Sequence, residues 1–134
     1  MILIDTSVLI DFFRGRETDK TRLMDKAHEM GIPYGISAFS YMELLRGART
    51  DGEFAKLREY LSTQAIYYLP EDEEAYSGVA YMYFDLLRRG VTPRNTVDLF
   101  IAFTAIANGL MLLHDDRDFD MMASYLPELK MFEA

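Results

Sequence analysis

The stretch MILIDTSVLIDFF (residues 1–13) sets two aspartates, Asp5 and Asp11, among apolar residues. Its start is a continuous apolar run, as expected of a parallel strand that is buried on both faces. An aspartate in such a setting is costly to bury without a partner, so Asp5 needs a specific role. Asp11 falls where the first helix should turn outward. We expect Asp11 at the surface or in a salt bridge with a nearby arginine.

Besides this first strand at residues 1–4, four more segments of the chain have strand character. They are residues 33–37, 65–69, 110–113 and, more weakly, 130–132. Helical patterns lie between them, at residues 19–30, 38–46, 53–62, 71–89 and 97–108, and all but the third are followed directly by glycine. Strands that alternate with helices indicate an α/β sandwich with a mainly parallel sheet. We expect a single domain over residues 1–134.

The composition limits the classes of function. The chain has 134 residues, half of them hydrophobic, and a net charge of −8 from 22 acidic and 14 basic residues. This imbalance argues against non-specific DNA binding, which needs a basic surface, but a bound cation can reverse the local charge. The absence of cysteine excludes thiolate sites for zinc or iron–sulfur clusters. No signal or membrane helix is predicted, so we expect a cytoplasmic protein without a membrane partner.

Acidic residues recur at the carboxyl ends of the predicted strands, where open α/β sheets bind their ligands. Asp5 follows the first strand, and the run LMLLHDDRDFD carries Asp116 and Asp118 just after another strand. Two helices add isolated acids, Glu43 within ISAFSYMELLRGA and Asp98 within TVDLFIAFTAIA. We predict that Asp5, Glu43, Asp98 and one of Asp116 or Asp118 form a single acidic pocket.

Such a pocket is best explained by a bound metal ion. Carboxylates that lie close together repel one another and raise one another's pKa values, which a divalent cation among them relieves. Oxygen ligands without cysteine and with little histidine select Mg²⁺ or Mn²⁺ rather than zinc. A site of this kind can activate water and polarise a phosphate.

Each acid also has an ordinary structural explanation. Asp5 could cap the helix that follows it, and Glu43 could close a capping box with Ser40. Asp98 could offset the dipole of its own helix or pair with Asn95 as a cap. Taken together, four isolated acids at one edge of the sheet are harder to explain as caps.

Three stretches together resemble the motifs of PIN domains. MILIDTSVLID resembles their opening strand, ISAFSYMELLRGA their second acidic motif, and TVDLFIAFTAIANGLMLLHDDRDF their closing block. The order of the motifs and the chain length are similar to those of VapC-type toxins of toxin–antitoxin pairs. The resemblance implies a metal-dependent ribonuclease with RNA as its substrate, a cognate antitoxin and a homodimer. It also implies a PIN-like three-layer sandwich, with five parallel strands in the order 3-2-1-4-5.

The resemblance also assigns residues. It implies that Asp5, Glu43, Asp98 and Asp116 are the catalytic and metal-binding acids. Three further positions are secondary candidates: Asp118 precedes the phenylalanine of the closing motif, Thr6 supplies a hydroxyl beside the first acid, and His114 stands where such proteins usually carry threonine or serine. On the residues themselves, His114 is better explained as a hydrogen-bonded residue at a strand end than as a ligand.

Several alternatives stay open at the level of sequence. Arg14, Arg16, Arg46 and Arg49 could contact an RNA backbone, contact an acidic antitoxin, or simply be solvated. The departure at His114 and the acidity of the chain also fit a catalytically weak or inactive PIN-like module that acts through protein binding. A different Mg²⁺-dependent phosphohydrolase is disfavoured, because no second aspartate stands at position seven.

Overall fold

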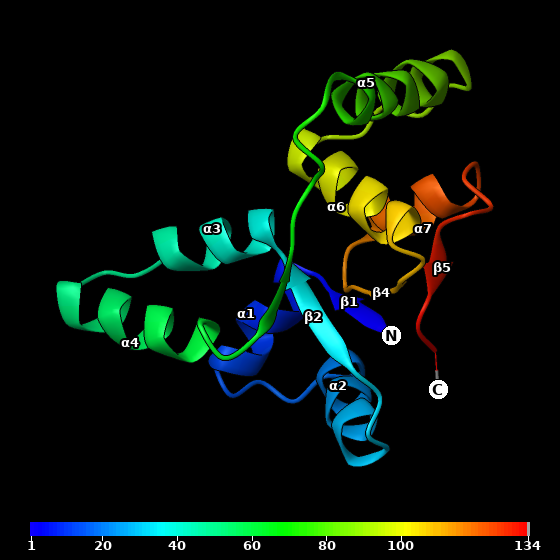
Figure 1. Ribbon diagram of the computed structural model, residues 1–134. Coiled ribbons are helices and arrows are strands. Elements are labelled where there is room, and N and C mark those ends of the chain that lie inside the picture. The colour runs from blue at the N-terminus through cyan, green and yellow to red at the C-terminus, as the bar shows by residue number, and fades with distance from the viewer. Residues whose placement is uncertain (134) are drawn as a thin grey trace.

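The computed structural model describes residues 1–133 and shows a five-stranded parallel sheet with helices on both faces (Figure 1). The strands are β1 (Ile2–Ile4), β2 (Tyr34–Ser37), β3 (Ala65–Tyr67), β4 (Met111–Leu113) and β5 (Lys130–Met131). The helices are α1 (Thr6–Phe13), α2 (Asp19–Glu29), α3 (Ala38–Arg46), α4 (Asp51–Leu61), α5 (Glu73–Arg88), α6 (Thr96–Ala107) and α7 (Arg117–Ala123). The strand order is β3-β2-β1-β4-β5, so the predicted fold class and order are confirmed.

The alternation of side chains along the central strands builds three layers. Ile2 and Ile4 of β1 belong to a buried cluster with side chains of α1, α2, α3 and α4. Leu3 points to the opposite face and joins a second buried cluster with α5, α6 and α7. Because β1 is buried on both faces, each of its positions must be apolar, which explains the unbroken apolar run.

Several elements differ from their predicted bounds. Helix α5 begins at Glu73, two residues later than predicted, because the side chain of Asp72 caps it by accepting a hydrogen bond from the Ala75 amide at 2.8 Å. Strand β3 ends at Tyr67 instead of residue 69, because Tyr68 turns into solvent while Leu69 returns to the core. Helix α7 follows β4 closely, in a part of the chain for which the sequence analysis predicted no helix.

The register of β1 and β4 aligns the two loops that matter for the site. Ile4 pairs with Leu113, and the Asp5 amide donates a hydrogen bond to the Leu113 carbonyl at 2.9 Å. The chain therefore leaves both strands at the same level of the sheet. As a result, Asp5 lies beside the loop that begins at His114.

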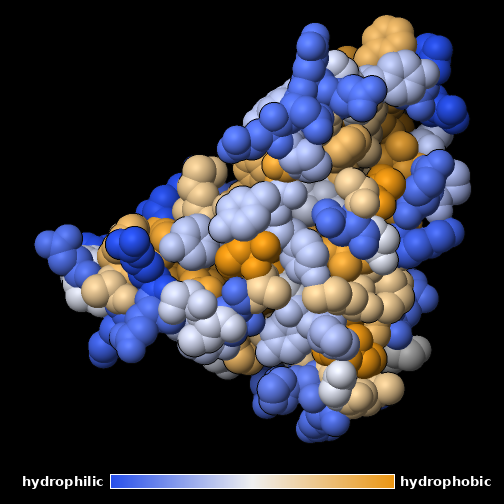
Figure 2. All heavy atoms as spheres, in the orientation of Figure 1, coloured by the Kyte–Doolittle hydropathy of each residue, from blue (hydrophilic) through white to orange (hydrophobic). Residues whose placement is uncertain are grey.

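The surface distribution of side chains fits this layered core. Figure 2 shows hydrophilic groups at the periphery of the viewed face and apolar groups near its middle, where Figure 1 draws the chain running from α4 to α5 in front of β2. Within residues 1–133, no helix combines the length and the apolar character that crossing a membrane requires.

Candidate active site

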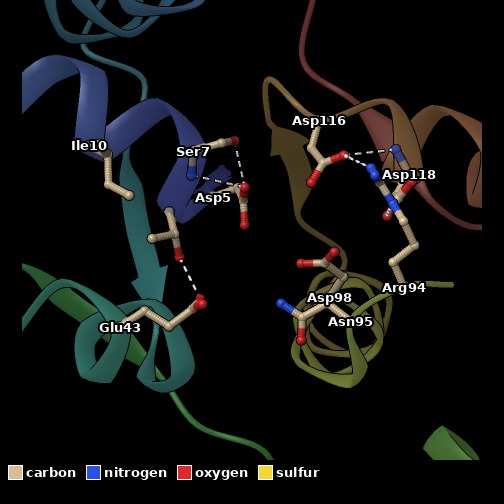
Figure 3. Close-up of a pocket in the computed structure, with 10 residues that line it drawn as sticks. Asp5, Ser7, Ile10, Glu43, Arg94, Asn95, Asp98, Asp116 and Asp118 are labelled. Carbon is tan, nitrogen blue, oxygen red and sulfur yellow. Dashed lines mark hydrogen bonds and ion pairs between the residues drawn. The ribbon is translucent and has the colours of Figure 1, made fainter. Parts of the chain in front are cut away.

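A cleft of about 340 Å³ opens at the carboxyl end of the sheet. It is lined by Asp5, Thr6, Ser7, Ile10, Glu43, Arg94, Asn95, Asp98, Asp116 and Asp118. These residues come from two walls that face each other in Figure 3. One wall is built by the end of β1 with α1 and α3, and the other by the starts of α6 and α7.

Hydrogen bonds fix both acids of the first wall. Asp5 is the N-cap of α1, and its Oδ2 accepts hydrogen bonds from the Ser7 amide at 3.0 Å and from the Ser7 hydroxyl at 2.6 Å. The Thr6 hydroxyl donates to Glu43 Oε1 at 2.9 Å and lies 2.9 Å from the buried Ser40 hydroxyl. Adjacent residues of α1 thus hold Asp5 and Glu43 in place.

The second wall brings three carboxylates together. Asp98, Asp116 and Asp118 each offer a carboxylate oxygen, and these oxygens lie within 4.8 Å of one another. Asp98 stands in the first turn of α6, whose N-cap is Asn95. Asp116 is the N-cap of α7, and its Oδ1 accepts a hydrogen bond from the Asp118 amide at 2.9 Å. The starts of two helices therefore converge on one small volume.

The placement of the predicted acids differs in one respect from the sequence analysis. All four primary candidates line the cleft, together with Thr6 and Asp118. The three-carboxylate cluster contains Asp118, however, whereas Asp5 and Glu43 face it from the opposite wall (Figure 3). Asp118 is therefore a full member of the acidic site by position.

His114 is not among the residues that line the cleft. It is only 4% exposed, its Nδ1 accepts a hydrogen bond from the Asp116 amide at 3.1 Å, and its Nε2 lies 3.2 Å from Asp120 Oδ1. Burial lowers the pKa of its imidazole, which favours the neutral form. His114 thus supports the loop that carries Asp116, and its bonds match those of a strand-end residue.

The structure also bears on the alternative explanations as helix caps. Asp5 is a cap and a cleft residue at once, so the two interpretations do not exclude each other. The capping box of Ser40 and Glu43 is wrong, because α3 begins at residue 38 and Ser37 is its N-cap. The side chain of Glu43 is instead free to reach Thr6.

The basic residues that the sequence analysis considered all lie outside the lining of the cleft. Arg16 pairs with Asp11 at 3.5 Å, which is the salt bridge expected for the second aspartate of the opening stretch. Arg46 lies 3.8 Å from Glu43 Oε2 on the rim.

Four lining residues were not assigned to the site from the sequence: Ser7, Ile10, Arg94 and Asn95. Arg94 precedes the α6 cap in a loop, so no helical or strand periodicity marks it. Its Nε donates a hydrogen bond to Asp118 Oδ2 at 3.0 Å, and its Nη2 lies 3.9 Å from Asp116 Oδ1. The one available signal was a lone arginine four residues before the isolated Asp98.

Burial, and to a lesser extent the crowding of carboxylates, raises pKa values in the cleft. Burial raises the pKa of Asp98 to about 7, and the charges of Asp5, Asp116, Asp118 and Glu43 add to this rise. Burial also raises the pKa of Asp5, although its hydrogen bonds with Ser7 oppose the rise. Such a donor set consists of carboxylate and hydroxyl oxygens and carries excess negative charge, so it fits a hard divalent cation.

The raised pKa of Asp98 predicts a pH dependence of stability in the metal-free protein. An aspartate whose pKa rises from 3.8 to about 7 binds a proton more tightly in the folded chain than in the unfolded chain. The proton bound by Asp98 therefore stabilises the folded chain at low pH. This contribution to the free energy of unfolding is lost as the pH rises towards 7. In the presence of a chelator at about pH 8, we expect the Asp98→Asn variant to melt roughly 3 °C above the parent. At about pH 5 this difference in melting temperature should be smaller. Thermal unfolding that shows the same difference at both pH values would contradict the shift.

Comparison with known proteins agrees with this geometry. The PIN-domain family model matches residues 2–124. Ribonuclease VapC11 of Mycobacterium tuberculosis is 31% identical over 132 residues, which cover 92% of this chain and 92% of that protein. A chain in a toxin–antitoxin complex from Klebsiella pneumoniae has a TM-score of 0.66 and 26% identity, with 100% of both chains covered. A chain of VapBC2 from Rickettsia felis, bound to a DNA fragment from its promoter, has a TM-score of 0.76 at 20% identity and 98% coverage of each chain, which shows the fold alone.

The parallel sheet and the acidic cleft at its carboxyl end define the class to which this protein belongs. With a family match over nearly the whole chain and a curated relative at 31% identity, the chain belongs to the PIN-domain family, and within it to the VapC-type ribonucleases.

Proposed function

We propose that this chain is a divalent-metal-dependent endoribonuclease and the toxin of a toxin–antitoxin pair. The observation that carries the proposal is the set of three carboxylates whose oxygens lie within 4.8 Å, with two further acids on the facing wall. An acidic cleft in an acidic protein would repel RNA unless a cation intervened. The match to a VapC ribonuclease over 92% of both chains supports RNA as the class of substrate.

The cofactor that fits this site is Mg²⁺ or Mn²⁺. Asp98, Asp116 and Asp118 would hold it, and Asp5, which lines the opposite wall of the cleft, would supply a further carboxylate. When bound, such an ion would polarise a phosphoryl oxygen and make water more acidic. Neutralising the cluster would also offset the repulsion that raises the pKa of Asp98.

The residues of the first wall would orient the attacking water and accept its proton. We assign Glu43 the task of orienting the attacking water and accepting its proton, with its carboxylate held by Thr6 at 2.9 Å. Attack of the water oxygen on phosphorus would break the bond to the leaving 3′ oxygen. Protonation of that oxygen leaves a 3′-hydroxyl and a 5′-phosphate.

The partner proteins also belong to this proposal. The Klebsiella structure is a complex of a toxin with its antitoxin, and we infer that a cognate antitoxin binds this chain. The homodimer, the single domain over residues 1–134 and the cytoplasmic location stay predictions. The alternative of an inactive module loses support, because His114, the departure that motivated it, lies outside the lining of the cleft.

A cleavage assay with a panel of RNAs tests the proposed function. We expect single-stranded or loop RNA to be cleaved with Mg²⁺ or Mn²⁺, and cleavage to stop when a chelator removes the ion. Analysis of the fragment ends should show 5′-phosphates. Cleavage that persists in chelator, or none of any RNA with either ion, would contradict the proposal.

A further inference from the structure

We propose that Arg94 binds a phosphodiester of the RNA in this cleft and so helps to hold the substrate. This inference rests on the proposed ribonuclease function and adds a substrate-binding residue to it. In the parts of the chain that the structure describes, Arg94 is the one basic side chain that lines the cleft. It lies on the wall of α6 and α7, beside the three-carboxylate cluster (Figure 3).

The geometry of Arg94 leaves most of its hydrogen-bonding capacity available. A guanidinium carries five N–H donors in a fixed planar fork. One of them, on Nε, donates to Asp118 Oδ2 at 3.0 Å, while the nearest approach of Nη2 to Asp116 Oδ1 is 3.9 Å. The side chain is 72% exposed, and the Nη1–Nη2 edge of its guanidinium makes no hydrogen bond with the described residues. This edge matches two oxygens of one phosphate.

The net charge of the cleft explains why a cation beside it would help RNA to bind. Five carboxylates line the cleft, and among residues 1–133 Arg94 is the one basic residue in that lining. One divalent ion would leave the cleft negative if all five were ionised, so an incoming phosphodiester would still meet repulsion. Arg94 reduces that repulsion at the point where RNA must enter. The rim arginine, Arg46, is already directed towards Glu43 at 3.8 Å.

The local structure also holds Arg94 ready before RNA arrives. It directly precedes Asn95, whose side chain caps α6 through the Val97 amide at 3.0 Å. Its pairing with Asp118 ties the guanidinium to the start of α7. A long side chain tethered at both ends loses less conformational freedom on binding a ligand, which favours binding.

Binding of a fluorescent single-stranded RNA tests this inference apart from catalysis. The parent for the assay is Asp5→Asn, which should cleave about 1000-fold more slowly. Anisotropy is followed with Mn²⁺ at several salt concentrations, within a time too short for cleavage. Adding Arg94→Gln should raise the Kd about tenfold and lower the salt slope by about 0.7, as expected for the loss of one phosphate contact to a single strand. Adding Arg94→Lys should keep the salt slope, because the charge remains, but should restore only part of the affinity, because an ammonium group cannot form the two parallel hydrogen bonds of the fork.

Arg22→Gln is the matched control. Arg22 is also a surface arginine paired with an aspartate, Asp19, but it lies on α2, away from the cleft. The same change in net charge there should leave the Kd and the salt slope unchanged. Mn²⁺ affinity, measured by calorimetry, should be equal or tighter in Arg94→Gln, because a competing cation is removed.

Three results would overturn the inference. One is an unchanged Kd and slope in Arg94→Gln, and another is a salt slope in Arg94→Lys that falls as far as it does in Arg94→Gln. The third is a weaker affinity for Mn²⁺ that accounts for the loss of RNA binding, because Arg94 would then only support Asp118. In the cleavage-competent protein, Arg94→Gln should mainly raise KM. Failure of the ribonuclease proposal looks different, since the unmodified protein would then cleave no RNA with either ion.

Discussion

Replacing Asp5 by asparagine is expected to slow metal-dependent RNA cleavage about 1000-fold while leaving the fold intact. Asp5 lines the cleft, is 4% exposed and caps α1 through the Ser7 amide. Asparagine is an equally favoured N-cap, so the cap survives the change and only the negative charge is lost. Initial cleavage rates with saturating Mn²⁺, together with thermal unfolding, measure the two effects separately.

Asp11→Asn is the matched control for this prediction. Asp11 belongs to the same short segment but pairs with Arg16 at 3.5 Å outside the cleft. Its loss should change the cleavage rate by less than about twofold, because Asp11 does not line the cleft and its partner Arg16 is exposed. An Asp5→Asn protein that folds and cleaves at the rate of Asp11→Asn would show that Asp5 is a cap without a part in the chemistry.

The largest expected effect on stability comes from Phe119→Ala. Phe119 is fully buried in α7, in the core cluster that joins this helix to α5 and α6, and its ring lies 5.1 Å from that of His114. Truncating a buried phenylalanine costs about 3–5 kcal/mol, through lost burial and the cavity left behind. For a chain of this size we expect Tm to fall by roughly 10 °C or more.

Met121→Ala provides the comparison for Phe119→Ala. Met121 lies two residues further along α7 than Phe119 but is 50% exposed. Alanine in its place is a good helix former. The Tm of Met121→Ala should stay within about 2 °C of the parent. Equal losses in the two variants, measured by thermal or denaturant unfolding, would show that α7 is not anchored through Phe119.

Much of this fold could be predicted from local features of the sequence. The unbroken apolar run at residues 1–4 predicted a central strand, and β1 is indeed paired on both sides and buried on both faces. Helix α6 is apolar nearly all round in sequence and packs in the core, as such a pattern predicts. The strand order came from the resemblance to PIN domains, since no local pattern specifies which strands are neighbours.

The details of the site needed three-dimensional information. The sequence indicated which acids lie at the carboxyl edge, but it could not rank their distances. Asp118 joins Asp98 and Asp116 because α7 starts shortly after β4 and its first residues lie at the cleft. Arg94 was missed because a loop residue has no periodicity to mark it, and its role depends on a contact 24 residues away along the chain.

A crystal structure of the protein soaked with Mn²⁺, with anomalous data collected near the manganese edge, would show whether the acidic cleft binds a divalent cation. We expect an anomalous peak coordinated by Asp98, Asp116 and Asp118, because their oxygens already lie within 4.8 Å of one another. A second peak nearer to Asp5 would fit a two-ion site. A protein that binds Mn²⁺ only elsewhere, with no peak in this cleft, would contradict the account.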